Sequence, residues 1–282
     1  MFSLTVENIN GEKLQLTNND NYAVTSITGL NPAPANINTS KLATNDGSIF
    51  NSSSVNQRNI VITVYIMRSI ERNRIALYKF FKPKHYVKIY YTNDSRNVFI
   101  EGYVETFEGD LFSQSENFQM SIICPSPFFK SVEQTSVTLS NMTSMFKFPF
   151  SIAEEGVPFS QIDEINMATL TNSGDVESGL IIDMYSNGTV VNPVIHNVTT
   201  SEFFKLNYTI HFGNTVRITT QKGQKSVKLL TYGVERNLIN YVAENSKWLQ
   251  STVGENKFTV TTDSGSSYLR TTIAETDLFE GV

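Results

Sequence analysis

The chain has 282 residues, of which 40% are hydrophobic and 17% charged, with a formal net charge of −5. A chain of this size can fold into roughly two domains with cores of their own, which excludes a disordered polymer. Residues 1–150 hold 13 Lys and Arg against 12 Asp and Glu, and the remainder hold 9 against 15, without a basic cluster in either half. This balance argues against sequence-specific nucleic-acid binding.

The first residues predict a β-hairpin. Phe2, Leu4 and Val6 alternate with polar residues, which is typical of a strand with one buried face. Residues 8–11, Asn-Ile-Asn-Gly, predict a turn, and the alternation resumes at Leu14. The amino terminus lacks the basic and long apolar segments of a signal peptide, so we expect synthesis in a cytoplasm without one.

Residues 31–58 are polar and rich in Asn, Ser and Pro, and they contain few core residues. A segment of this length is rarely a simple loop inside a compact domain. The sequence therefore leaves two alternatives: a disordered loop, or an arm or belt that finds its partners outside its own domain.

Residues 59–67 are nearly all apolar, and we expect a strand that is buried on both faces. This stretch is the longest apolar run, and it is shorter than the ~20 residues that a membrane span needs, so no membrane insertion is expected. A helix is predicted from a cap at Ser69 to the stop at Pro83, with Ile70, Leu77, Phe80 and Phe81 on its buried face.

Three further strands complete the predicted first domain, over 86–91, 97–107 and 118–124, and prolines end the last of them. We place the boundary near residue 130. Residues 131–150 are predicted to form a crossing linker that includes the apolar cluster Phe146, Phe148 and Phe150.

The second half, 151–282, contains short apolar strands separated by turn residues, which predicts a β-sandwich. A tight turn is expected at Asn187-Gly188. Residues 204–212 alternate cleanly and predict one strand, on which His211 faces solvent opposite to Phe212. The fold class is therefore mainly all-β, with one α-helix in the first domain.

The sequence holds no pattern typical of a catalytic or metal site. The histidines His85, His196 and His211 have no partner at metal-binding spacing, and the single cysteine, Cys124, lies in an apolar run without a CxxC partner. Motifs of hydrolases and nucleotide-binding enzymes are missing. We expect no catalytic residue, metal or cofactor, and hence no enzyme.

Several stretches, in this order and spacing, resemble the siphovirus-type distal tail protein family of phages that infect Gram-positive bacteria. No single stretch is diagnostic, but together they cover nearly the whole chain. They are Phe2–Val6, Ile27–Leu30, Asp46–Asn51, Arg58–Ile62, Asn73–Phe81, Gly174–Gly179, Asn192–Asn197, Gly223–Val227 and Phe279–Val282.

The resemblance implies an architecture and a role. An N-terminal β-sandwich with one helix would form a ring, usually a homohexamer, around the tail channel, and a C-terminal galectin-like or jelly-roll β-sandwich would project outward. The ring would sit in the baseplate at the virion tail tip, between the tail tube protein and the tail-associated hub or lysin protein. The chain is too short for the inserted carbohydrate-binding module of some relatives.

A ring of identical subunits needs contacts that close by rotation, and such contacts need a surface segment that reaches a neighbour. We hypothesise that residues 31–58 leave their domain as an arm that docks on the adjacent subunit. Ile49 and Phe50 are the expected apolar anchors, and Arg58 is expected near the base of the arm.

Two other functions remain open on the sequence. A carbohydrate-binding module that contributes to host-surface adhesion would use Trp248, with Tyr232 or Tyr241, as a stacking platform. A hydrolase of cell-wall polymer would use the acidic pairs 154–155 or 163–164. A contractile tail or a phage-derived bacteriocin is a variant of the structural role that the sequence does not separate from a long non-contractile tail.

Overall fold

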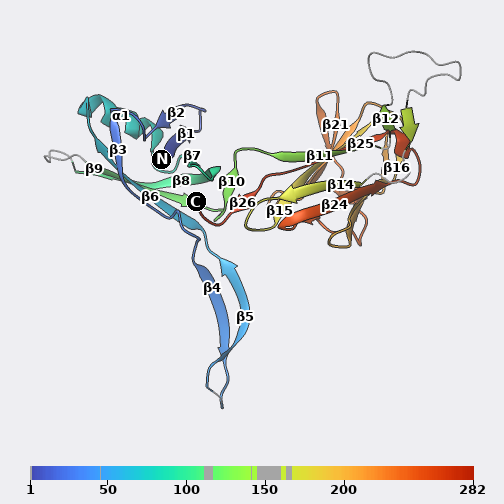
Figure 1. Ribbon diagram of the computed structural model, residues 1–282, viewed down its shortest axis with the longest axis horizontal. Helices are drawn as coiled ribbons and strands as arrows, with labels where there is room; N and C mark the ends of the chain where they lie inside the picture. The colour runs from blue at the N-terminus through green and yellow to red at the C-terminus, as the bar shows by residue number, and fades with distance from the viewer. Residues whose placement is uncertain (1, 45, 111–116, 141, 145–159, 163–166) are drawn as a thin grey trace. The chain divides into compact units, whose positions relative to one another are not determined.

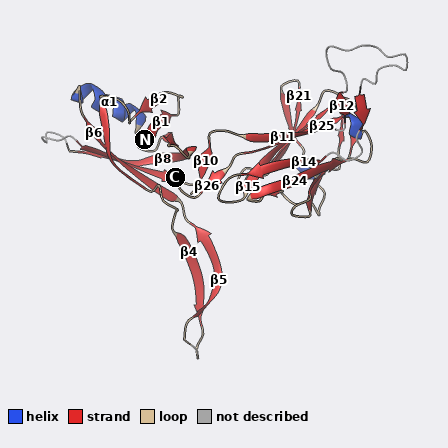
Figure 2. Cartoon of the chain, in the orientation of Figure 1, coloured by secondary structure: helices blue, strands red, loops and turns tan. Residues whose placement is uncertain are grey.

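The computed structural model describes all residues except 1, 45, 111–116, 141, 145–159 and 163–166 (Figure 1). It divides into two compact units. The first comprises Met1–Glu133 together with Leu278–Val282, and the second comprises Gln134–Asp277. The described elements are nearly all strands, as Figure 2 shows, which confirms the mainly β fold class.

The first unit is built on one antiparallel sheet of nine strands, in the order β2-β1-β7-β8-β9-β6-β3 with β10 and β26 beside β8. The long strand β8 pairs with β7 along its first half and with β9 along its second half. Both halves of the sheet contribute to one hydrophobic core. The strands are β1 Ser3–Asn8, β2 Lys13–Gln15, β3 Tyr22–Thr28, β6 Arg58–Ile66, β7 Tyr86–Thr92, β8 Asn97–Gly109, β9 Asn117–Cys124, β10 Phe129–Ser131 and β26 Leu278–Phe279.

The predicted opening hairpin is confirmed, since β1 and β2 pair antiparallel across the predicted turn. Strand β6 differs from the expectation of two buried faces. Ile60, Ile62, Val64 and Ile66 are buried, whereas the alternate residues are half-buried or exposed. The physical reason is that this sheet is antiparallel and has its core on one face only.

The predicted helix is α1, Ile70–Phe80. Leu77, Phe80 and Phe81 are buried as predicted, but Ile70 is 43% exposed. Ser69 occupies the N-cap position in the left-handed conformation, and its side chain makes no capping hydrogen bond. No helix in the described part of the chain is long and apolar enough to span a bilayer.

The second unit has two main antiparallel sheets, with the orders β11-β25-β15-β20-β21-β22 and β14-β24-β17-β18, that enclose a common core. Two 3-10 turns, Ile239–Tyr241 and Ser266–Tyr268, accompany them. The strands are β11 Thr135–Ser140, β12 Met142–Ser144, β13 Ser160–Ile162, β14 Met167–Asn172, β15 Ser178–Ser186, β16 Val190–Val191, β17 Val194–Asn197, β18 Glu202–Lys205, β19 Thr209–Ile210, β20 Thr215–Thr219, β21 Ser226–Thr231, β22 Val234–Asn237, β23 Gln250–Ser251, β24 Gly254–Thr261 and β25 Leu269–Glu275.

The single strand predicted over 204–212 is wrong. The chain forms β18 and β19 instead, because Leu206 bridges to Val242 between them and pairs the backbone with a different segment. His211 is exposed, as predicted, but Phe212 is exposed as well. The cluster Phe146, Phe148 and Phe150 lies outside the described residues.

Candidate assembly interface

Residues 35–55 form a two-stranded ribbon that leaves the first unit (Figure 1). Its strands, β4 Ala35–Lys41 and β5 Ser48–Val55, pair antiparallel with each other, and every residue of both is exposed. Gly47, in the connecting turn, has a φ of 94°, a conformation that glycine adopts without strain. We call this ribbon the arm.

Polar side chains hold the arm together in place of a core. Asn38 Nδ2 donates to Ser52 Oγ at 3.0 Å, and Asn51 Nδ2 donates to Ser40 Oγ at 2.6 Å. These bonds span the two strands and stabilise their pairing. An isolated hairpin of this kind is marginally stable in water, so the arm is suited to gain stability from a partner.

Two features of the arm are typical of a docking segment. Ile49 is 51% exposed and Phe50 60%, and neighbouring residues of a strand point to opposite faces, so each face of β5 carries a large apolar side chain. In the described part of the chain each arm strand pairs only with the other, so its outer edge presents unpaired backbone groups. A partner strand could pair with either edge.

The base of the arm is fixed by a buried guanidinium. Arg58 is 2% exposed. Its Nε donates to the carbonyl oxygen of Pro127 at 2.6 Å, and its Nη1 donates to those of Gly29 and Asn31 at 2.5 Å. Nη2 donates to the carbonyl of Glu280, also at 2.5 Å. One side chain therefore ties together the entry to the arm, the loop after β9 and the carboxyl-terminal segment; we call this cluster the arm root.

The arm root is compact on every side. The guanidinium carbon of Arg58 lies 4.7 Å from the ring centroid of Phe129, and burial lowers the Arg58 pKa from its ordinary value without making the group neutral. Gly29 has a φ of 85°, and a Cβ there would lie 2.1 Å from the carbonyl oxygen of Asn59. The amide of Val282 donates to the carbonyl of Leu30 at 3.2 Å.

The three candidate interface residues thus occupy two places. Ile49 and Phe50 lie on the arm with their side chains in solvent, and Arg58 lies in the arm root with its donors used inside the chain. Sequence reasoning missed the partners of Arg58 in the carboxyl-terminal segment. They are carbonyl oxygens far along the chain, and a backbone acceptor leaves no signal in the identity of a residue.

No group of three or more His, Cys, Asp and Glu among the described residues lies close enough together to hold a metal ion. Cys124 is buried, and burial raises the pKa of its thiol to about 12. The acidic pairs at 154–155 and 163–164 lie outside the described residues.

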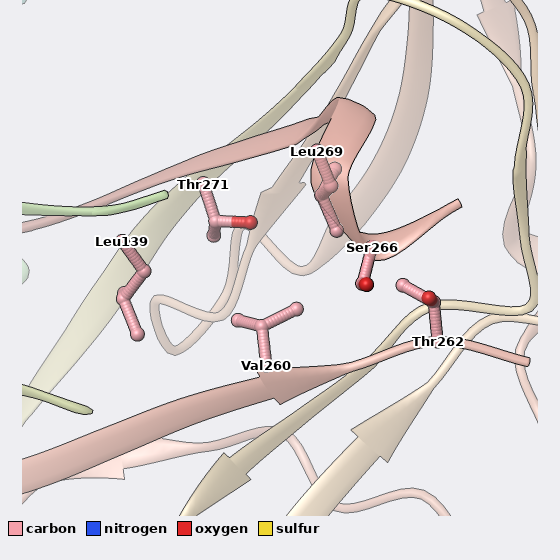
Figure 3. A pocket seen from close by; sticks show the side chains of 6 residues that line it. All are labelled: Leu139, Val260, Thr262, Ser266, Leu269 and Thr271. Atoms are coloured by element: carbon pink, nitrogen blue, oxygen red, sulfur yellow. The ribbon is translucent and has the colours of Figure 1, made fainter. Parts of the chain in front are cut away.

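A small cavity lies inside the second unit, between Leu139, Val260 and Leu269, with the hydroxyls of Thr262 and Thr271 at its wall (Figure 3). Its volume of about 10 Å³ is roughly that of one water molecule. Both hydroxyls are buried without a hydrogen-bond partner in the described part of the chain. The cavity is therefore too small for any larger ligand.

The three aromatic residues considered as a stacking platform have separate neighbours. Tyr232 is 92% exposed at the turn between β21 and β22, and the Tyr241 ring lies 5.0 Å from that of Tyr208. The Trp248 ring lies 5.3 Å from that of Phe204. No aromatic contact among the described residues joins the three.

Each half of the chain matches the profile of a known domain family. Residues 9–124 match the profile of the phage tail protein RIFT-related domain, and residues 173–274 match that of the siphovirus-type tail component, C-terminal domain. Among curated protein sequences, none matches the chain significantly.

Solved structures share the fold over the whole chain. The Dit (gp 19.1) protein of phage SPP1, described as a paradigm of the hub adsorption apparatus in phages that infect Gram-positive bacteria, aligns with a TM-score of 0.71 at 12% identity over 99% of both chains. A chain of the phage P2 baseplate in its activated conformation with Ca aligns at 0.56 and 10% identity over all of both chains. The corresponding structure with Sr aligns at 0.53 and 10% identity, over 97% of this chain and 98% of that one.

Proposed function

This chain belongs to the siphovirus-type distal tail protein family, and we propose that six copies of it form a ring that joins the tail tube to the tail-associated hub protein and the host-adhesion apparatus. Its role is that of a structural component of a phage tail or baseplate. The ring, its size and its two neighbours are the proposal.

The exposed arm is the observation that best supports the proposed ring. A ring of like subunits needs a heterologous contact, in which one surface of a subunit meets a different surface of the next. The arm offers such a surface because its strands are fully exposed, carry Ile49 and Phe50, and pair with no other strand among the described residues. We infer that the arm docks on the adjacent subunit. Arg58, in the arm root, would then fix the direction in which the arm leaves the first unit.

We propose also that the chain catalyses no reaction. A thiol with a raised pKa, such as that of Cys124, is a poor nucleophile at neutral pH, and His211 lies exposed on a surface turn. These positions support a protein that works by binding other tail proteins.

The arm hypothesis is tested by changing its two apolar side chains together. We expect Ile49→Asp with Phe50→Asp to leave both units folded and to abolish rings, because two carboxylates cannot be buried in an apolar contact. The control is Phe212→Asp, an equally exposed phenylalanine of the second unit that should leave rings intact.

Rings are counted by negative-stain microscopy of the purified chain, alone and mixed with its tube and hub proteins, since weak ring contacts can need those scaffolds to close. A shortened chain without residues 33–54 should behave like the double variant. Rings of unchanged size from the shortened chain would show that the arm is not the subunit contact.

A further inference from the structure

The two faces of the arm differ in chemistry. Residues that lie opposite each other in an antiparallel pair project to the same face, and successive residues of a strand alternate between faces. The register places three of the four large apolar side chains of β4 and β5 on one face: Ile37 opposite Ser53, Phe50 opposite Thr39 and Val55 opposite Ala35. Ile37 is 58% exposed, Phe50 60% and Val55 39%. We call this side of the arm the apolar face.

The opposite side of the arm, which we call the polar face, is held by its own hydrogen bonds. Three of them cross the ribbon: Asn36 Nδ2 donates to Asn56 Oδ1 at 2.8 Å, Asn38 Nδ2 to Ser52 Oγ at 3.0 Å, and Asn51 Nδ2 to Ser40 Oγ at 2.6 Å. Ile49 is the one large apolar side chain that the two fully described strands place on this face. Burial of amides and hydroxyls costs free energy unless each donor and acceptor keeps a partner, so the polar face is suited to water.

A β-bulge creates this division of the arm. The register shifts after Asn38, and Asn51 is an extra residue of β5. Regular alternation along β5 would have placed Phe50 on the same face as Ser52, which belongs to the polar face. The bulge reverses the alternation, so that Phe50 lies on the apolar face instead. The sequence alone cannot distinguish Phe50 from Ile49 in this way.

The arm has the reach and the charge balance to lie on a second copy of the chain. Its strands of seven and eight residues extend for about 25 Å. A compact unit of the size of the first unit has a radius of gyration of roughly 14 Å, so the arm can cross most of it. Residues 35–55 carry one cation, Lys41, and one anion, Asp46. This balance favours an apolar contact over attraction between opposite charges.

The area of the apolar face indicates a ring and not an isolated pair. A ribbon of two strands that is about 25 Å long and roughly 10 Å wide presents on the order of 250 Å² on each face. A stable complex of two proteins buries about 800 Å² on each partner. One docked arm is therefore too small to hold a lone pair together, whereas a closed ring holds each copy through its own arm and through the arm of a neighbour.

We propose that the arm docks on the adjacent copy through its apolar face alone, with Phe50 and Ile37 as anchors, while the polar face stays in water. This inference rests on the proposed ring and adds which face of the arm forms the contact. Every residue of the two strands is exposed in the single chain, so docking removes apolar surface from water. Ile49 contributes little to docking, and Phe50 accounts for most of the effect of the double aspartate variant.

Single substitutions on the two faces test the proposal. Phe50→Asp and Ile37→Asp should each abolish rings of the full chain mixed with its tube and hub proteins, since each places a carboxylate in the apolar contact. Ile49→Asp is the matched control. It changes the residue next to Phe50, which is 51% exposed on the polar face, and rings should persist. Negative-stain microscopy counts the rings, and scanning calorimetry checks that both units remain folded.

Thiol labelling locates the buried face directly. Ser53 and Ser54 are adjacent and exposed, and they lie on the apolar face and the polar face respectively. The thiol of Cys124 is buried, so a maleimide reports on the introduced cysteine. In separate subunits, Ser53→Cys and Ser54→Cys should react equally fast. In assembled rings, we expect Ser53→Cys to be protected and Ser54→Cys to react as before.

The outcomes distinguish this inference from the proposed function. Docking by one face is overturned if Ile49→Asp abolishes rings as Phe50→Asp does, if rings persist in all three single variants, or if the two thiols react equally in rings. The arm would remain the subunit contact if the chain without residues 33–54 still formed no rings. Rings from that shortened chain, or none from the unchanged chain in any mixture, would overturn both.

Discussion

Arg58 holds the arm root together because the N–H donors of its guanidinium group point in fixed directions. Its planar guanidinium reaches four carbonyl oxygens on three segments of chain, and the face of the group lies against Phe129. A lysine ammonium has three donors on one atom and cannot repeat this geometry. The arm root therefore needs arginine and not merely a positive charge.

We expect Arg58→Ala to destabilise the first unit by about 3 kcal/mol or more, because it leaves several buried carbonyls without donors. Arg58→Lys should recover only part of this loss. Scanning calorimetry of the full chain measures both, and the emission of Trp248 identifies the transition that belongs to the second unit. A lysine variant as stable as the unchanged protein would contradict the account of the arm root.

A second residue-scale prediction concerns Glu275, which is 1% exposed at the end of β25. Ser178 Oγ donates to its Oε2 at 3.0 Å, and the hydroxyls of Ser178 and Ser251 both act to lower the pKa of the carboxyl group. Burial raises the Glu275 pKa above its ordinary value of 4.5, and the neighbouring carboxylate of Asp277 acts in the same direction.

A raised carboxyl pKa means that the folded chain binds this proton more tightly than the unfolded chain does. The contribution of Glu275 to stability is thus present below its ordinary pKa and is lost as the pH rises through the raised value. We expect Glu275→Gln to stabilise the second unit by about 1–2 kcal/mol at neutral pH. The gain should vanish in acid.

Thermal unfolding across this pH range provides the measurement, and the exposed Glu244→Gln serves as the control with no such pH dependence. A gain from Glu275→Gln that is equal at all pH values would refute the buried charge as its cause.

At the scale of elements, the apolar patterns of the sequence predicted the strands and the helix correctly wherever a local pattern alone decides the structure. The opening hairpin, helix α1 and strands β7 to β9 follow from the alternation or helical spacing of nearby residues. Prediction was wrong where tertiary contacts compete with a local pattern. Leu206 and Val242 interrupt a clean alternation in this way, since their bridge pulls the chain out of the expected strand.

Helix α1 provides the test at this scale. We expect Leu77→Ala, which removes a fully buried side chain, to cost about 2–5 kcal/mol in the free energy of unfolding. Ile75→Ala, on the same helix but 62% exposed, should change it by less than about 0.5 kcal/mol. Denaturant unfolding compares the pair, and equal effects would show that the helix does not pack as described.

At the scale of the whole molecule, the carboxyl-terminal segment belongs to the first unit although residues 134–277 form the second. Strand β26 pairs with β10, Phe279 lies beneath the guanidinium of Arg96 at 3.9 Å, and Glu280 accepts from Arg58. No local pattern predicts that the chain returns to the first unit at residue 278, because a two-residue strand gives no periodic signal. The exposed arm, by contrast, could be anticipated from its long polar composition.

Removal of residues 278–282 should lower the unfolding temperature of the first unit, since it removes β26 and one acceptor of Arg58. The second unit should unfold as before, because its strands end at Glu275. Scanning calorimetry of the shortened and the full chain separates the two transitions. A loss confined to the second unit would contradict this assignment.

The return of residues 278–282 also sets an order of events during synthesis. Domains usually fold as they leave the ribosome, amino-terminal part first, but here the arm root lacks the acceptor at Glu280 until translation has passed the second unit. A nascent or prematurely terminated product therefore carries an unfinished root. On the proposed ring, we expect such a product to dock its arm poorly and to be left out of the assembly.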